Sequence, residues 1–506
     1  MTNPLYDTLF GAHAGKDTPF LHLPGGTTIT HAAFLAQTAQ MAHALTDLGL
    51  QAGDRVAAQI DKSPNALALY AACAQTGLIF LPLNTAYTEG ELSYFVENSG
   101  ARLLVASGKA AKALTPMAGR LGTRLETLDA DGGTLAEAAS TNPTTFQTAE
   151  RSKDDLAAFL YTSGTTGRSK GAMLTQSNLL SNAQTLAKLW RFTQDDTLLH
   201  ALPIFHTHGL FVATNVTLIA GGSMIFLPKF DLDAMIDHMP QATAMMGVPT
   251  FYTRLLDDPR FTAGLTRHMR LFVSGSAPLL AETHTRFEER TGHRILERYG
   301  MTETNMNTSN PYDGDRRPGT VGFPLPDVEL KITDPATGGA LPDGEIGQIE
   351  VRGPNVFKGY WQMPDKTAAE LRADGFFITG DLGTRDADGY IRIVGRNKDL
   401  IISGGYNIYP KEIEILLDDQ PGIRESAVIG VPHPDFGETV VGILVPESGA
   451  HPDPDNILAA IAPSLARFKH PRKLILADEL PRNTMGKVQK NVLREAHAGL
   501  FAAAET

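Results

Sequence analysis

The segment from 161 to 171, YTSGTTGRSKG, constrains the fold and chemistry of this chain more than any other. It follows an apolar run, Leu156–Tyr161, that is typical of a buried strand. Its glycines let backbone N–H groups approach an anion, its hydroxyls donate further hydrogen bonds, and Lys170 adds a positive charge. The segment indicates a polyphosphate site, although it is not a Walker A loop, because Ser169 precedes Lys170. A simple surface turn is the alternative interpretation.

Length and composition indicate a globular protein of several domains. The chain has 506 residues, of which 42% are hydrophobic and 20% are charged. Its net charge of −12 argues against general binding of nucleic acid. The single cysteine, Cys73, excludes an intrachain disulfide and a cysteine-rich metal site, and we expect it to be a buried apolar residue.

The N-terminal residues and the hydropathy pattern predict a cytoplasmic protein without a membrane partner. No basic segment followed by an apolar segment opens the chain, so we expect no signal peptide. No stretch reaches the roughly 18 apolar residues that a membrane-spanning helix needs.

Before residue 395, helical and strand-like segments alternate. This alternation predicts the α/β class with largely parallel sheets. The predicted helices are His31–Gly49 and Asn65–Thr76, and the predicted strands are Arg55–Gln59, Leu78–Pro82, Arg102–Ala106, Val328–Thr333 and Gly347–Arg352. We expect the last two strands to be antiparallel, because the turn-rich segment 334–345 separates them.

The pattern changes near Gly395, where the segment GRNKDLIISGGYNIYP (395–410) is first charged, then apolar, then rich in glycine. A compact α+β pattern follows, so we predict an N-terminal domain of residues 1–395 and a C-terminal domain of residues 396–506. The predicted elements there are helices Pro410–Leu417 and Pro454–Leu465 and strands Glu425–Val431, Val440–Val445 and Lys473–Leu476.

Five further motifs follow the glycine-rich loop in order: FHTHG (205–209), SGSAP (274–278), ERYGMTE (297–303), TGD (379–381) and PRNTMGKVQK (481–490). Together with 161–171 and 395–410, they resemble the adenylate-forming acyl-CoA synthetases, a family shared with luciferases and nonribosomal-peptide adenylation domains. The resemblance covers essentially the whole chain. It implies a large N-terminal domain of layered sheets and helices that binds AMP and the acid, and a small mobile C-terminal domain.

The resemblance implies a reaction in two steps. A carboxylate attacks the α-phosphorus of ATP and gives an acyl-adenylate and pyrophosphate, and the thiol of coenzyme A then displaces AMP. The expected partners are therefore ATP, a carboxylic acid and coenzyme A. The expected cofactor is Mg²⁺, which enters with ATP, and no tightly bound organic cofactor is expected.

The resemblance also implies residue roles. Lys487 would reach the α-phosphate, His206 would gate the acceptor channel and contact the acyl carboxylate, and Glu303 would bind Mg²⁺ with Thr162 close by. Asp381 would accept hydrogen bonds from the ribose hydroxyls, and Tyr299 would stack on adenine. The residues implied for ATP or AMP binding are Thr162, Ser163, Gly164, Thr165, Thr166, Gly167, Lys170, Ser276, Ala277, Pro278, Glu297, Arg298, Tyr299, Gly300, Met301, Thr302, Asp381, Arg396 and Lys487.

Further implied roles concern the second step and its control. Lys398 matches the family's hinge position, about which the C-terminal domain would swing after adenylation. Coenzyme A would contact the C-terminal domain at Gly404, Gly405, Tyr406 and Lys469. A lysine acyltransferase or deacylase acting on Lys487 is a further expected partner, because acylation would remove its charge.

Two arginines favour a dicarboxylic acid. Arg254 lies in a segment that contributes to the family's acyl pocket, and Arg298 precedes Tyr299. Guanidinium groups are costly to bury without an anion and suit a second carboxylate, with Ser276 and His206 as further contacts. Within the family the chain resembles the malonyl-CoA synthetases, which implies malonate and methylmalonate as substrates. Either arginine could instead lie on the surface or pair with Glu297 or Asp257. Met301 and Met306 are expected to form the pocket wall that faces an α-substituent of the acid.

Three alternatives remain open from the sequence. The first is a CoA synthetase for short- or medium-chain monocarboxylates, and the second is an adenylation enzyme that loads a carrier protein. The third is a non-catalytic relative, which the intact site residues disfavour. We expect His208 to be structural, and the His206-x-His208 pair lacks a third nearby residue for a metal site.

Overall fold

The computed structural model describes residues 2–162, 169–404, 406–483 and 486–501, and the chain forms two compact units. Unit 1 comprises Met1–Leu330 and Val351–Phe377, and unit 2 comprises Lys331–Glu350 and Ile378–Thr506. Residues 331–350 and 378–395, which we assigned to the N-terminal domain, thus belong to the second compact unit. A functional boundary at residue 395 stays a prediction.

The first sheet of unit 1 has six strands, most of them parallel, as expected for the predicted α/β class. Its strands β6, β5, β3, β4 and β7 are parallel neighbours, and only the last pair, β7 and β8, is antiparallel. The predicted strands are confirmed to within a residue or two. In sheet order the bounds are β6 (Arg124–Thr127), β5 (Leu103–Ala106), β3 (Arg55–Gln59), β4 (Ile79–Pro82), β7 (Leu156–Thr162) and β8 (Lys170–Thr175).

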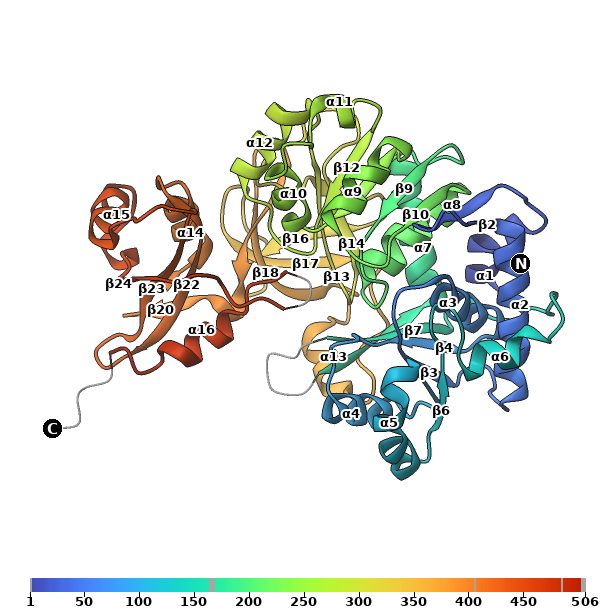
Figure 1. Cartoon of the computed structure of the whole chain (residues 1–506). Helices are drawn as coiled ribbons and strands as arrows, with labels where there is room; N and C mark the ends of the chain where they lie inside the picture. Colours follow the sequence, from blue (N-terminus) through green and yellow to red (C-terminus); the bar gives the residue numbers. More distant parts are fainter. Residues whose placement is uncertain (1, 163–168, 405, 484–485, 502–506) are drawn as a thin grey trace. The chain divides into compact units, whose positions relative to one another are not determined.

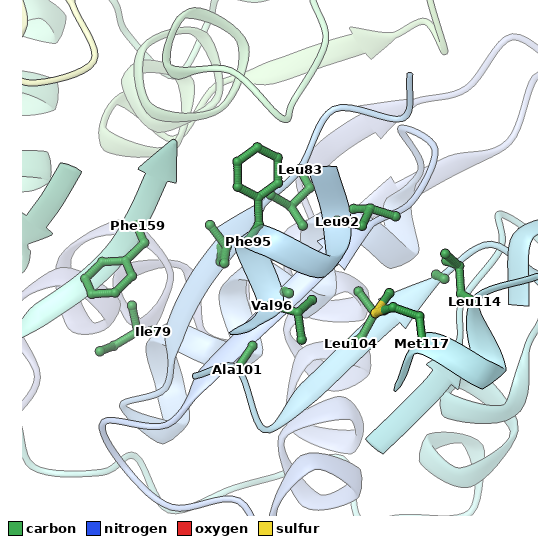
Figure 2. Packing of buried hydrophobic residues seen from close by; sticks show 13 residues of the cluster. Ile79, Leu83, Leu92, Phe95, Val96, Ala101, Leu104, Leu114, Met117 and Phe159 are labelled. Atoms are coloured by element: carbon green, nitrogen blue, oxygen red, sulfur yellow. The ribbon is translucent and has the colours of Figure 1, made fainter. Parts of the chain in front are cut away.

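Residues at the helix ends determine where the helices that cover this sheet begin and end. Helix α3 (Pro64–Thr76) begins where the Ser63 side chain accepts a hydrogen bond from the Ala66 N–H, and it ends at Gly77 with φ of 75°. Helices α4 (Glu89–Ser99) and α5 (Gly108–Leu121) pack their apolar side chains against one face of the sheet (Figures 1 and 2). Figure 2 shows this core, with Phe95 of α4, Met117 of α5 and Phe159 of β7.

The second sheet of unit 1 has nine strands, and its central part is parallel. Strands β13, β12, β11, β9, β10 and β1 form parallel neighbours, whereas β15, β14 and β2 add antiparallel edges. The bounds are β15 (Phe323–Pro324), β14 (Asn305–Ser309), β13 (Leu296–Met301), β12 (Leu271–Ser274), β11 (Ala244–Gly247), β9 (Thr197–His200), β10 (Ser223–Phe226), β1 (Pro19–His22) and β2 (Thr28–Thr30). Two of the motifs, FHTHG and SGSAP, follow the carboxyl ends of parallel strands β9 and β12, where α/β sheets bind ligands.

Other helices of unit 1 connect these strands. They are α1 (Pro4–Leu9), α2 (His31–Asp47), α6 (Thr134–Ser140), α7 (Gln176–Leu189), the π-helix η2 (His208–Thr214), α8 (Asn215–Ala220), α9 (Leu232–His238), α10 (Pro249–Leu256), α11 (Ala263–Thr266), α12 (Ala281–Thr291) and α13 (Pro364–Glu370), with short 3₁₀ turns η1 (Gly11–His13) and η3 (Met239–Gln241). The predicted helices are confirmed as α2 and α3. Cys73 of α3 is fully buried, as expected, and burial raises the pKa of its thiol.

Unit 2 contains a four-stranded and a five-stranded sheet. The four-stranded sheet consists of β16 (Glu329–Thr333), β17 (Gly347–Arg352), β18 (Phe377–Arg385) and β19 (Ile391–Arg396). The five-stranded sheet consists of β21 (Tyr406–Ile408), β20 (Ile401–Ser403), β23 (Gly437–Pro446), β22 (Ile423–His433) and β24 (Lys473–Leu476). Strand β24 matches its predicted bounds and pairs with β23 in parallel.

The five-stranded sheet is covered on both faces. Alternate residues of β22 and β23 belong to two apolar clusters, one with α14 (Pro410–Asp418) and α15 (Pro454–Ile461) and one with Leu493 of α16 (Lys490–His497). Helix α15 ends before the predicted Leu465, because Pro463 follows in a 3₁₀ turn, Ala462–Ser464. The described part of the chain contains no helix long and apolar enough to span a membrane.

Candidate active site

Glu303 lies at the centre of a buried oxygen cluster in unit 1. Its side chain is 4% exposed, and its Oε1 lies 3.4 Å from the Thr162 hydroxyl and 3.1 Å from the Tyr360 hydroxyl. Its Oε2 makes no hydrogen bond with the described residues. Oxygen donors of this kind suit Mg²⁺, which takes one or two protein carboxylates together with phosphates and waters. No cluster of three or more His, Cys, Asp and Glu side chains that could hold a metal occurs among the described residues.

Lys170, at the start of β8, is tied to the same cluster. Its Nζ lies 3.1 Å from the Tyr360 hydroxyl and 3.3 Å from Glu370 Oε2. The Tyr360 hydroxyl lies 2.7 Å from Glu370, and Lys366 forms a second ion pair with that carboxylate. Burial raises the pKa of Glu370, but the neighbouring Lys366, Tyr360 and Lys170 outweigh it and lower that pKa overall. Tyr360 and Glu370 were not among the predicted site residues.

Five predicted phosphate-loop residues, Ser163 to Gly167, lie outside the described residues. The strands on either side are described and antiparallel, with Thr162 opposite Lys170. The two ends of the loop are therefore held together beside the Glu303 cluster.

The FHTHG segment meets the SGSAP segment in unit 1. His208 is 1% exposed, and its Nδ1 lies 3.1 Å from the Ser276 hydroxyl. Ser276 has a φ of 72°, which is rare for a residue other than glycine and frequent at functional sites. The half-buried His206 accepts a hydrogen bond at its Nδ1 from the His208 N–H. The structural role expected for His208 stays a prediction, and its contact is with Ser276, a predicted acid-binding residue.

Arg298, in β13, is a buried cation with unpaired donors. It is 4% exposed, and its Nε and Nη2 have no hydrogen-bond partner among the described residues. Burial lowers the pKa of its guanidinium to about 9, and the neighbouring Tyr252 only partly opposes this. A Cβ at Gly275 would lie 2.3 Å from the guanidinium carbon, so glycine there leaves room for it. A buried guanidinium of this kind suits an anionic ligand.

The second predicted acid-binding arginine is in a different environment. Arg254 of α10 is exposed, and its guanidinium lies 5.7 Å from the Phe230 ring centroid. Thus only one of the two arginines is buried. The acidic neighbours considered for them have other partners: Glu297 lies 3.5 Å from His284, and Asp257 lies 3.9 Å from Arg286.

The remaining predicted nucleotide residues of unit 1 lie along β13 and after β12. Half-buried Tyr299 pairs with Thr308 of β14, and a β-bulge follows at Gly300, where a Cβ would lie 1.9 Å from the Asn305 carbonyl oxygen. Glu297 is buried, and burial raises its pKa. Of the other positions, Ala277, Met301 and Thr302 are half-buried, Pro278 is exposed and Met306 is buried.

Unit 2 carries the predicted ribose site. Asp381 of β18 is 3% exposed and forms an ion pair with Arg396 of β19, with 2.6 Å between Oδ1 and Nε. The two residues are direct partners in the antiparallel register. Thr379 Oγ1 accepts a hydrogen bond from the Asp381 N–H. This pair places a carboxylate and a cation side by side, and their contacts with a ribose and a phosphate stay a prediction.

Lys487 belongs to unit 2 and is hydrogen-bonded to Asn483, while residues 484–485 lie outside the described part of the chain. The Asn483 N–H donates to the Lys487 carbonyl at 2.9 Å, and the Asn483 side chain accepts from the Lys487 N–H at 3.0 Å. Gly486 has a φ of 74°, a conformation that favours glycine. Lys487 is exposed, and so is Lys398, which lies in the 3₁₀ turn η4 (Asn397–Asp399).

The predicted coenzyme A residues also belong to unit 2. Tyr406 is 56% exposed and stacks on Phe468, with 4.5 Å between the ring centroids. Lys469 forms an ion pair with Glu412 at 2.6 Å, and Gly404 has a φ of 57°. Gly405 lies outside the described residues.

Comparison with known proteins agrees with this arrangement. Residues 11–361 match the family model "AMP-binding enzyme", and residues 412–487 match "AMP-binding enzyme C-terminal domain". The chain belongs to the AMP-binding enzyme family. It is an AMP-forming CoA ligase that acts through an acyl-adenylate.

Individual relatives cover nearly all of the chain. It is 37% identical to the feruloyl-CoA synthase of an Amycolatopsis species over 93% of this chain and 94% of the relative. It is 35% identical to the malonate–CoA ligase of Arabidopsis thaliana over 83% of this chain and 74% of the relative. The crystal structure of ATP-bound MatB from Rhodopseudomonas palustris is 56% identical, with a TM-score of 0.97, and the match covers 99% of this chain and all of that one.

Proposed function

We propose that this enzyme ligates malonate, and also methylmalonate, to coenzyme A, with AMP and pyrophosphate as products. The observation that carries the proposal is the buried, partly unpaired guanidinium of Arg298. When one carboxylate of malonate is activated, the other keeps its charge. A guanidinium in a dry site can take that charge through paired, charge-assisted hydrogen bonds.

A bound anion would also supply hydrogen-bond partners to other buried polar groups of the FHTHG and SGSAP motifs. Thr207 Oγ1, His208 Nε2 and Ser274 Oγ are buried and lack hydrogen-bond partners among the described residues. Buried polar atoms are rarely left unpaired in folded proteins, so their concentration here indicates a ligand site. The likeness to the Arabidopsis malonate–CoA ligase supports the same substrate.

We propose that Glu303, with Thr162 beside it, holds the Mg²⁺ that enters with ATP. The ion would neutralise charge on the phosphates when the acid attacks. Lys170 and the loop from Ser163 to Gly167 would contact the outer phosphates, and Tyr299 would stack on adenine. These roles rest on the oxygen cluster around Glu303 and on the motif matches.

We propose three roles for unit 2. Asp381 would bind the ribose hydroxyls with Arg396 beside it, and Lys487 would stabilise charge on the α-phosphate and the attacking carboxylate. Lys398 would be the hinge about which the C-terminal domain turns, and the face with Tyr406 and Lys469 would meet coenzyme A. A lysine acyltransferase could regulate the enzyme by acylating Lys487 in the cytoplasm.

A second candidate function is ligation of an aromatic or aliphatic monocarboxylate. The likeness to a feruloyl-CoA synthase favours it. Such an acid would bring no charge to Arg298, so the cost of burying that guanidinium would remain uncompensated. We therefore prefer the dicarboxylate.

The test is release of AMP with ATP, Mg²⁺, coenzyme A and a panel of acids: malonate, methylmalonate, succinate, acetate, butyrate, benzoate and ferulate. We expect malonate to have the highest kcat/KM. A preference for any monocarboxylate over malonate would overturn the assignment. Replacing coenzyme A with a carrier protein as the acceptor tests the carrier-loading alternative in the same assay.

A further inference from the structure

Lys62 forms an unusual contact between the carboxyl end of β3, in the six-stranded sheet, and that of β9, in the nine-stranded sheet. It lies between β3 and α3, and its Nζ is 2.8 Å from Nδ1 and 2.7 Å from the carbonyl oxygen of His200, the last residue of β9. The same Nζ lies 4.3 Å from the Phe226 ring centroid. Among the described residues, Lys62 forms no ion pair with a carboxylate. Burial lowers the pKa of Lys62 well below its ordinary value.

The hydrogen bonds of His200 fix its tautomer. Its ring is 1% exposed, and Nε2 lies 2.9 Å from the Gly209 carbonyl oxygen. A carbonyl only accepts, so Nε2 carries the proton, and Nδ1 of the neutral ring must accept from Lys62. The contacts with Gly209 and Lys62 therefore favour the same tautomer, and Lys62 fixes the orientation of the ring that donates to Gly209.

Gly209 connects this pair to the acid site. It is the second residue of the π-helix η2, directly after His208, and a Cβ at this position would lie 2.0 Å from the Pro203 carbonyl oxygen. His208 in turn contacts Ser276 at 3.1 Å. A shift of the Gly209 carbonyl would therefore move His208 relative to Ser276.

We propose that Lys62 and His200 are positioning residues of the acid site, which hold the FHTHG segment in place through the Gly209 carbonyl. The proposal rests on the proposed role of the His206, His208 and Ser276 segments in acid binding. Neither residue touches the reacting atoms in this account. Their effect is on the KM of the acid and on the first half-reaction.

The test compares Lys62→Met with a matched control. Lys16 belongs to an equivalent chain of lysine, histidine and backbone carbonyl elsewhere in unit 1. Its Nζ lies 3.2 Å from His13 Nδ1, and His13 Nε2 lies 2.7 Å from the Leu218 carbonyl oxygen. Lys62→Met should raise the KM of malonate roughly tenfold or more and leave the KM of ATP within about twofold. Lys16→Met should change neither KM. An unchanged KM of malonate in folded Lys62→Met would overturn the proposal.

Substitutions of His200 provide a second, independent readout. Glutamine can donate to the Gly209 carbonyl and accept from Lys62, whereas leucine can do neither. His200→Gln should therefore keep the KM of malonate closer to wild type than His200→Leu does. Equal effects of the two substitutions would contradict a role through hydrogen bonding. Nitrogen NMR of histidine-labelled protein should show the Nε2–H tautomer of His200 in the wild type and a shift of its Nδ1 resonance in Lys62→Met, where Nδ1 loses its hydrogen-bond donor.

The two proposals can fail separately. If the wild type prefers another acid, the proposal of malonate as substrate is wrong, and the KM values of wild type and variants are then compared for the preferred acid. If malonate is preferred but Lys62→Met and His200→Leu leave its KM unchanged, only the positioning role fails.

Discussion

At the scale of single residues, Arg298 shows how a proposed binding group can reduce stability. Its guanidinium is 4% exposed with two unpaired nitrogen atoms, and burial lowers its pKa to about 9. Folding must remove water from this charge without a protein anion to replace it. The ligand-free enzyme therefore carries a cost that the proposed binding of a carboxylate would offset.

The cost of burying the Arg298 guanidinium predicts that its removal stabilises the ligand-free enzyme. Arg298→Met should raise the Tm of the ligand-free enzyme, because about 1 kcal/mol or more of desolvation cost disappears. Malonate should raise the Tm of the wild type but not of the variant. Thermal unfolding with and without malonate measures both effects. Arg254→Met is the control: this arginine is exposed, so its loss should leave the Tm nearly unchanged. A lower Tm for Arg298→Met than for the wild type would contradict the account.

Glu303 permits a second prediction at this scale. Glu303→Gln keeps an acceptor for the Tyr360 hydroxyl at the position of Oε1 but removes the negative charge. It should weaken binding of Mg²⁺ together with a non-hydrolysable ATP analogue and slow adenylation by roughly 10²–10³-fold. Calorimetric titration measures the affinity for Mg²⁺. Glu370→Gln is the control: Glu370 lies on the other side of the Tyr360 hydroxyl, and its substitution should lower the Mg²⁺ affinity much less. The same Mg²⁺ affinity in Glu303→Gln and wild type would rule out the ligand role.

At the scale of elements, a buried histidine pair joins the N-terminal segment to helix α2. His13 and His31 lie with ring centroids 4.5 Å apart, and their Nε2 atoms contact the carbonyl oxygens of Leu218 and Gly222. Burial lowers the pKa of His31 to about 4, and the neighbouring His13 and Lys16 add to this effect. Phe20 stacks on His31 from β1.

Acid should therefore weaken this junction. Below about pH 6.5 the unfolded chain takes up a proton on His31, whereas the folded chain does not until about pH 4, so the free energy of unfolding falls across that window. The loss amounts to roughly 3 kcal/mol over the whole window. His31→Phe should reduce the difference in Tm between about pH 7.5 and about pH 5, whereas substitution of the exposed His451 should not. An unaltered difference in His31→Phe would count against the pair as the acid-sensitive element.

The elements also show what the sequence could and could not predict. Alternating periodicity and cap residues such as Ser63 and Gly77 act locally, so β3, α3 and β24 were predicted nearly to the residue. Contacts between distant segments have no local signal. Tyr360 is 57 residues from Glu303, and Lys62 is 138 residues from His200, so neither contact could be predicted. The motifs identified Arg298 and Arg254 as candidates, but the burial of the first and the exposure of the second depend on tertiary packing, which has no local signal.

At the scale of the whole molecule, the two half-reactions are predicted to depend on different residues. Lys487→Ala should slow adenylation by roughly 10²–10³-fold and leave thioester formation from synthetic malonyl-AMP nearly unchanged. Lys398→Pro should do the opposite, because proline fixes φ at the proposed hinge and restricts the domain swing. Pyrophosphate release and thioester formation, measured separately, give the two rates. Equal losses in both half-reactions for either variant would refute the division of roles.

The central claim is that Arg298 recognises the second carboxylate of the acid. The most direct measurement is the ratio of kcat/KM for malonate to that for acetate in the wild type and in Arg298→Ala. The account predicts a large ratio in the wild type that falls roughly 10–150-fold in the variant, because the variant loses one charge-assisted contact with malonate and none with acetate. A ratio that is the same in both enzymes, or a wild type that prefers acetate, would contradict it.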